Sequence, residues 1–135
     1  LVHPGHRVLD VGCGSGVLAI AAARFGAAYS EGVDIAPAAV PVTLANARLN
    51  GVDVEVSNMP LEDVSGTFDV VFANILAPVL ISLSDELKRV LARSGRLVIS
   101  GILANNHQHV LDALAPLHPV RVDELDGWVA VELAW

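Results

Sequence analysis

The sequence has 135 residues, enough for one hydrophobic core but too few for two independent domains. Hydrophobic residues form 53% of the chain and charged residues 17%, which excludes a disordered protein. The formal net charge is -7 and the Lys and Arg residues are scattered, so no basic track is available to follow a nucleic-acid backbone. An acidic surface favours a basic partner, although the same charge also serves ordinary solubility.

The sequence shows no pattern for a membrane span, a leader or a metal site. Its apolar stretch at 17–23 is followed by Arg24, well short of the roughly 20 residues that a bilayer span needs. The first residues lack a signal-peptide pattern and the lone Cys13 cannot form an internal disulfide, so we expect a cytoplasmic protein. His107 and His109 point to different faces of a predicted helix, and the remaining histidines are not spaced as metal ligands.

Strands and helices alternate in the first part of the chain. A short apolar run predicts a strand at 7–11, and helix formers at 17–25 follow a glycine cluster. A second strand at 29–33 precedes an alanine-rich helix that starts near Pro37 and closes at 50–51. Alternation with acids predicts a third strand at 52–56.

The alternation continues to the end of the chain. The run at 68–73 is nearly all apolar, which suits a central strand buried on both faces. Pro78 opens one helix that Gly95 ends, and a fifth strand follows at 96–100. Asn105 or Asn106 is expected to cap a further helix.

The last two strands, at 120–125 and 128–133, are separated by Asp126 and Gly127, a strong signal for a hairpin. A long alternation of strands and helices that ends in an antiparallel hairpin predicts a doubly wound α/β fold. We expect three layers, with helices on both faces of a mostly parallel sheet.

A glycine loop follows the first predicted strand, where an open parallel sheet binds its ligand. Its glycines are Gly12, Gly14 and Gly16, and the acid Asp10 precedes them. A dinucleotide fingerprint requires its third glycine at position 17, which is Val17, so the spacing disfavours a nicotinamide-dependent oxidoreductase. The spacing GxGxG after an acid is the form used by class I methyltransferases, although a glycine-rich turn without a ligand is the simpler alternative.

An acid ends the second strand, where a carboxylate can accept hydrogen bonds from ribose hydroxyls. This residue is Asp34, and its alternative role is to favour the dipole of the following helix. Ile35 offers an apolar face for adenine, and Asn58 with Met59 could form the opposite wall. Met59 could equally be a core residue.

Several longer motifs identify a family. The chain contains VLDVGCGSGVLAIAAA, VDI, FDVVFANILA, GRLVISGIL and GWVAVEL in this order. In their order and spacing these segments resemble the catalytic domain of the ribosomal protein L-eleven methyltransferase (PrmA-type) family over nearly the whole chain. The NILA and SGIL elements are more specific than the glycine loop.

The resemblance implies a Rossmann-like sheet of strand order 3-2-1-4-5-7-6 with an antiparallel last strand, binding S-adenosylmethionine and methylating amino groups of a ribosomal protein. It assigns the glycine loop to Gly12, Gly14 and Gly16 and the ribose acid to Asp34. It also assigns Asn74, Ile75 and Leu76 to a motif that faces the cofactor and the acceptor amine. Trp128 matches an aromatic of the family pattern, and its alternative role is to cover the sheet edge.

Two departures from the family pattern stand out. Cys13 occupies a loop position that is often Thr in the family, and we interpret it as a small spacer because methyl transfer needs no nucleophilic thiol. The chain begins at Leu1 rather than Met, so we expect residues 1–135 to be a catalytic domain without the family's amino-terminal substrate-recognition domain. A domain that binds cofactor without turnover is therefore the main alternative function.

Overall fold

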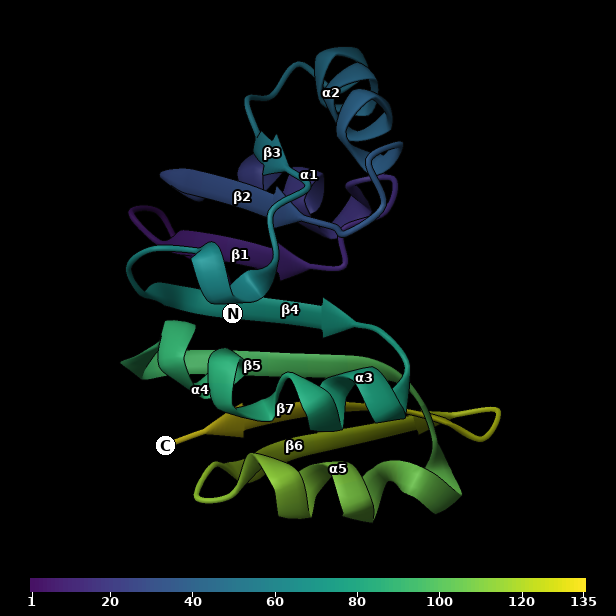
Figure 1. Ribbon diagram of the computed structural model, residues 1–135. Helices are drawn as coiled ribbons and strands as arrows, with labels where there is room; N and C mark the ends of the chain where they lie inside the picture. The colour runs from purple at the N-terminus through teal and green to yellow at the C-terminus, as the bar shows by residue number, and fades with distance from the viewer.

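The computed structural model describes all 135 residues, which form one sheet with helices on both faces (Figure 1). The elements are, in chain order, β1 Arg7–Val11, α1 Val17–Arg24, β2 Tyr29–Val33, α2 Ala39–Leu49, β3 Glu55–Ser57, η1 Leu61–Asp63, β4 Phe68–Asn74, α3 Ala77–Ser82, α4 Ser84–Val90, β5 Leu91–Leu103, η2 Ala104–Asn106, α5 His107–Leu114, β6 His118–Leu125 and β7 Trp128–Ala134. No helix has the length and apolar character needed to cross a bilayer.

The strand order of the seven-stranded sheet is β3-β2-β1-β4-β5-β7-β6, which confirms the predicted topology. β1 lies in the centre of the parallel part and pairs with β2 on one side and β4 on the other. β7 runs antiparallel to both β5 and β6. The strand order therefore reverses between β1 and β4, and the loops after β1, β2 and β4 meet at one edge of the sheet.

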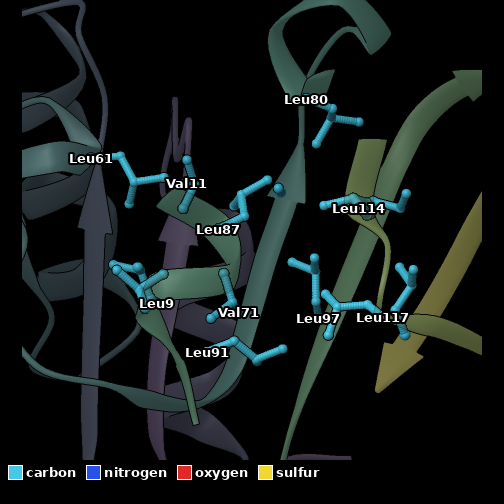
Figure 2. Packing of buried hydrophobic residues seen from close by; sticks show 14 of the residues in the cluster. Leu9, Val11, Leu61, Val71, Leu80, Leu87, Leu91, Leu97, Leu114 and Leu117 are labelled. Atoms are coloured by element: carbon cyan, nitrogen blue, oxygen red, sulfur yellow. The ribbon is translucent and has the colours of Figure 1, made fainter. Parts of the chain in front are cut away.

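Side chains of β1 show how the three layers are built. Leu9 and Val11 belong to a cluster of 21 buried apolar residues that includes side chains of α3, α4 and α5 (Figure 2). Val8, which points to the opposite face, packs instead with Ala22 of α1 and with Val70. Successive residues of a strand alternate between faces, so a strand covered on both sides reads as a continuous apolar run.

One predicted strand boundary and one predicted helix cap are wrong. The third strand was expected at 52–56 but is β3, Glu55–Ser57. The amide of Val52 instead donates to Ala47 O, 3.1 Å away, to complete the end of α2, and pairing with β2 begins only at Glu55. The helix after Asn106 begins where expected, at His107, but no side chain caps it.

The region after Pro78 differs more from the predicted elements. The single predicted helix is divided at Leu83 into α3 and α4, and the strand expected at 96–100 already begins at Leu91. Gly95 lies inside this strand rather than at a helix end. A Cβ there would lie 2.9 Å from Ala92 O and 3.0 Å from Asp69 O, so the glycine permits close backbone approach at a point where the β4 and β5 registers shift.

The hairpin prediction is confirmed. Asp126 and Gly127 both have positive φ, 53° and 80°, as a two-residue turn of the I′ type requires. β6 forms the edge of the sheet and is exposed along its whole length.

Candidate cofactor cavity and adjoining groove

A cavity of about 510 Å³ opens at the carboxyl ends of β1, β2 and β4. Its volume is within the range of about 300–1,000 Å³ that small-molecule sites occupy. The lining residues are Val11, Gly12, Val33, Asp34, Ile35, Met59, Pro60, Leu61, Glu62, Ile75, Leu76, Val79, Ser82 and Leu83. The structure thus brings together six of the predicted site residues, Gly12, Asp34, Ile35, Met59, Ile75 and Leu76.

The glycine loop begins by folding onto the end of β2. The amides of Gly12 and Cys13 donate to Val33 O at 2.8 and 3.1 Å. Gly12 has a φ of 73°, and a Cβ at this position would collide with the side chain of Ile75. The first glycine of the motif is therefore required both for the turn and for contact between the loop and the segment after β4.

Asp34 lines the cavity and also holds the loop. One oxygen of its carboxylate accepts a hydrogen bond from Gly14 N and the other accepts one from Ala36 N, both at 2.9 Å. A carboxylate has about four acceptor positions, so capacity remains for the hydroxyls of a ligand. The two roles considered for Asp34, toward a ligand and toward the start of the next helical segment, are compatible in this geometry.

Asp10 lies beneath the loop and does not line the cavity. It is 2% exposed, and its carboxylate accepts a hydrogen bond from Ala19 N in the first turn of α1 at 3.2 Å. Burial raises its pKa to about 6, the bond from Ala19 opposes this shift, and the charge of Asp34 adds to it. Asp10 thus joins the first strand to the helix that follows the glycine loop.

Thr43 is a site residue that the sequence analysis missed. It is fully buried on α2, and its hydroxyl donates to Gly14 O at 3.2 Å. A Cβ on Gly16 would lie 2.6 Å from Thr43 Cγ2, so the third glycine of the motif allows α2 to pack against the loop. The only signal in the sequence is a polar residue on a helix face that is otherwise Ala, a pattern that does not reveal a loop contact.

Cys13 is buried and lies 3.8 Å from the Thr43 hydroxyl, measured from Sγ to Oγ1. Burial is the largest cause of the raised pKa of its thiol. A neutral, enclosed thiol is a poor nucleophile, which supports the interpretation of Cys13 as a spacer.

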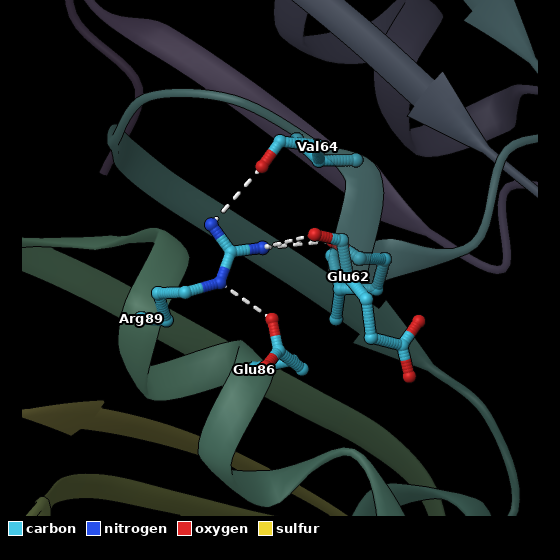
Figure 3. A network of polar contacts seen from close by, with 5 residues as sticks. Glu62, Val64, Glu86 and Arg89 are labelled. Carbon is cyan, nitrogen blue, oxygen red and sulfur yellow. Dashed lines mark hydrogen bonds and ion pairs between the residues drawn. The ribbon is translucent and has the colours of Figure 1, made fainter.

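One wall of the cavity comes from the turn η1, which the sequence analysis did not include in the site. Arg89 of α4 holds this turn by donating to Val64 O at 3.0 Å and Leu61 O at 2.9 Å (Figure 3). Glu86 in turn forms an ion pair with Arg89. Ile35 and Met59 contribute apolar surface to the cavity, whereas Asn58 is exposed and lies outside its lining.

The segment after β4 contributes to two hollows. Ile75 and Leu76 line the cavity, whereas Asn74 lines a neighbouring groove of about 370 Å³. The other residues of the groove are Ser100, Gly101, Asp123, Glu124, Leu125, Trp128, Val129 and Ala130. Trp128 is 53% exposed and opposes Leu125 across the hairpin, so it lies both at the groove and at the sheet edge.

The sheet order, the glycine loop and the acid after β2 together define the class of Rossmann-like methyltransferases. The family model "Ribosomal protein L11 methyltransferase (PrmA)" matches residues 1–134. The chain belongs to this family.

Individual relatives agree with this family assignment. A ribosomal protein L11 methyltransferase of Symbiobacterium thermophilum is 42% identical over 134 residues, which are 97% of this chain and 44% of that protein. The crystal structure of a ribosomal protein L11 methylase from Lactobacillus delbrueckii has a TM-score of 0.94 at 34% identity, covering 99% of this chain and 71% of that one. An RNA methyltransferase from Salinibacter ruber, solved with S-adenosyl-L-homocysteine, has a TM-score of 0.76 at 25% identity, covering 94% and 78%. The chain therefore spans less than half of the length of the Symbiobacterium relative.

Proposed function

We propose that this chain is a catalytic domain that binds S-adenosylmethionine and transfers methyl groups to amino groups of a ribosomal protein. The observation that carries this proposal is the cavity at the reversal of strand order, where Gly12, Asp34 and Ile75 meet. Membership of the ribosomal protein L11 methyltransferase family supports both the reaction and the substrate. The net charge of -7 suits a basic acceptor protein.

The cavity fits the proposed cofactor chemically. Ile35, Met59 and Leu76 supply apolar surface of the kind that an adenine ring contacts. Asp34 keeps acceptor capacity for ribose hydroxyls at the cavity. The glycine loop approaches without side chains, at the amino end of α1, where the helix dipole favours the carboxylate of a methionine moiety.

S-adenosylmethionine, when bound, supplies an electrophilic methyl group, so the protein's task is to orient the acceptor. Asn74 is exposed in the groove beside the cavity, and its carboxamide oxygen can accept a hydrogen bond from an amine and aim the nitrogen lone pair. A lysine acceptor has a reference pKa near 10.4 and must lose a proton first. The amide of Asn74 is no base, so it cannot take up that proton.

Calorimetric titration of the folded chain with S-adenosylmethionine and S-adenosylhomocysteine tests cofactor binding. We expect binding of both, and an affinity roughly 10- to 100-fold lower for Asp34→Ala, because hydrogen bonds to a charged group are worth about 1.5–3 kcal/mol each. NADH serves as the control ligand. Absence of binding at millimolar cofactor would contradict the proposal, and an unchanged affinity in Asp34→Ala would limit Asp34 to its backbone contacts.

Methyl transfer to purified ribosomal protein L11 tests the reaction itself. The full-length Symbiobacterium relative serves as the positive control, and cofactor is kept saturating. We expect residues 1–135 on their own to bind cofactor but to transfer methyl groups more slowly than the relative, of which they span 44%. A lysine that is not docked by further parts of the protein loses much of the benefit of orientation, up to about 7–11 kcal/mol. Binding with no transfer at all would assign the chain to the alternative of a cofactor-binding domain without turnover.

A further inference from the structure

The strand β5 is irregular where it passes Asn74. Its pairing with β4 reaches Asn74 opposite Ser100, and its pairing with β7 shifts register between Ile99 and Ile102. Gly101 lies within this irregularity and has a φ of 78°, in the left-handed region. The bulge therefore lies at the groove, next to the residue that we propose orients the acceptor amine.

The Asn74 side chain occupies the space that a side chain on Gly101 would need. A Cβ at Gly101 would lie 2.7 Å from Asn74 Oδ1, and 3.6 Å from Ile75 O. Separations under 3.0 Å are essentially never seen for real Cβ atoms, so something would have to move. Asn74 Oδ1 is the end of an exposed side chain, so the carboxamide would move before the backbone of the bulge does.

No hydrogen bond within the chain holds the carboxamide of Asn74, and the residue is exposed. The missing Cβ at Gly101 therefore leaves open the space that the amide oxygen of Asn74 occupies. This contact also links the two motifs NILA and SGIL, which are far apart in the sequence.

We propose that Gly101 is a positioning residue for methyl transfer, because its lack of a Cβ lets the Asn74 carboxamide lie over the β5 bulge with its oxygen free for the acceptor amine. This inference rests on the proposed function. Gly101 does not line the cofactor cavity, so its effect should fall on transfer and not on cofactor binding.

A glycine with positive φ is also favoured for its backbone alone, and the chain offers a matched control for that effect. Gly127 has a φ of 80°, close to that of Gly101, but a Cβ there meets nothing within 4 Å. Gly127→Ala therefore carries the backbone strain of Gly101→Ala without the contact with Asn74.

The first experiment is a thermal-unfolding cycle that needs no activity. Gly101→Ala is made in the wild-type chain and in the Asn74→Ala variant, and Gly127→Ala is made in both. We expect Gly101→Ala to lower Tm more when Asn74 is present than when it is absent, whereas Gly127→Ala costs the same in both. If Gly101→Ala alone does not fold, folding of the Asn74→Ala/Gly101→Ala double variant supports the contact. Equal costs in both backgrounds, or failure of the double variant to fold, would overturn the proposal.

The second experiment measures methyl transfer and S-adenosylmethionine affinity for the wild-type chain, for Asn74→Ala and for the same four glycine variants. Gly101→Ala should lower kcat by roughly 10- to 100-fold, the scale expected when a reacting group is misplaced by about 1 Å, and should leave cofactor affinity unchanged. In the Asn74→Ala background it should have no further effect on kcat. An additional loss there, or a loss confined to cofactor affinity, would show that Gly101 does not act through Asn74. If the wild-type chain transfers no methyl group, the proposed function fails while the unfolding cycle still decides whether Gly101 places Asn74.

Discussion

The two sides of the sheet are held together by different interactions. On the side of α1 and α2, the contacts that define the site are hydrogen bonds between side chains and the backbone. Asp10 and Asp34 accept from backbone amides, and Thr43 donates to a backbone carbonyl. The buried apolar clusters there are small, with four and three members. On the side of α3, α4 and α5, one cluster of 21 residues joins the helices to the sheet.

This difference matches what each region does. A cofactor loop must follow a defined backbone path, and hydrogen bonds have the directionality that such a path requires. Apolar packing is less directional and scales with buried area, so it supplies the bulk of the stability. Four substitutions, taken from the largest expected effect to the smallest, test this separation.

Leu97→Ala probes the large apolar cluster. Leu97 is fully buried in β5, and the loss of its side chain should lower the free energy of unfolding by about 2–5 kcal/mol. Chemical denaturation measures this change. Cofactor affinity per folded molecule should be unchanged, because Leu97 lies outside the cavity lining. A loss of affinity in the folded variant would show that the two regions are not separable.

Asp10→Asn probes the buried carboxylate of the polar region. The pKa of Asp10 is raised from 3.8 to about 6, so the folded state binds the proton more tightly than the unfolded state. The contribution of the Asp10 carboxyl to the free energy of unfolding of the wild type is therefore present at low pH and is lost as the pH rises through about 6. The variant keeps an oxygen for the amide of Ala19 and should be more stable than the wild type by about 2–3 kcal/mol above pH 6. The measurement is denaturation of both proteins from pH 4 to 8, and a difference that does not vary with pH would contradict the assignment.

Thr43→Val removes the hydroxyl that bonds to Gly14 O while it keeps the shape of the side chain. The free energy of unfolding should fall by about 1 kcal/mol, the usual net worth of one hydrogen bond. Because this hydrogen bond restrains the loop, part of the free energy lost with it should appear as weaker cofactor binding. The expected fall in affinity is about two- to fivefold. Thr43→Ser is the control, since it retains the hydroxyl. Equal affinities in all three proteins would remove Thr43 from the set that shapes the loop.

Cys13→Ala should have the smallest effect. The thiol is buried against Thr43, but it forms no part of the cavity lining, so a loss of about 1 kcal/mol or less in stability is expected, with unchanged cofactor affinity. Calorimetry and denaturation of the same samples check both. Loss of binding in a folded variant would mean that the thiol has a role beyond filling space.

Local pattern was enough to predict much of this protein. Apolar runs marked the strands, the Asp-Gly pair marked the hairpin, and GxGxG with Asp34 marked the loops that meet at the cavity. These features are readable because each depends on residues close together in the chain. The boundaries failed at β3, where the amide of Val52 completes the end of α2, and at Leu91, where pairing with the distant strand β4 overrides local propensity.

The tertiary structure alone decided which distant residues share a function. Thr43 against the glycine loop, Arg89 against η1, and Gly101 beneath Asn74 are contacts between segments at least 25 residues apart. A sequence pattern records spacing along the chain, whereas these contacts depend on how strands order themselves in the sheet and how helices pack on its faces. For that reason the sequence by itself determined the class of fold and the loops of the site, and only the folded chain determined what holds those loops in place.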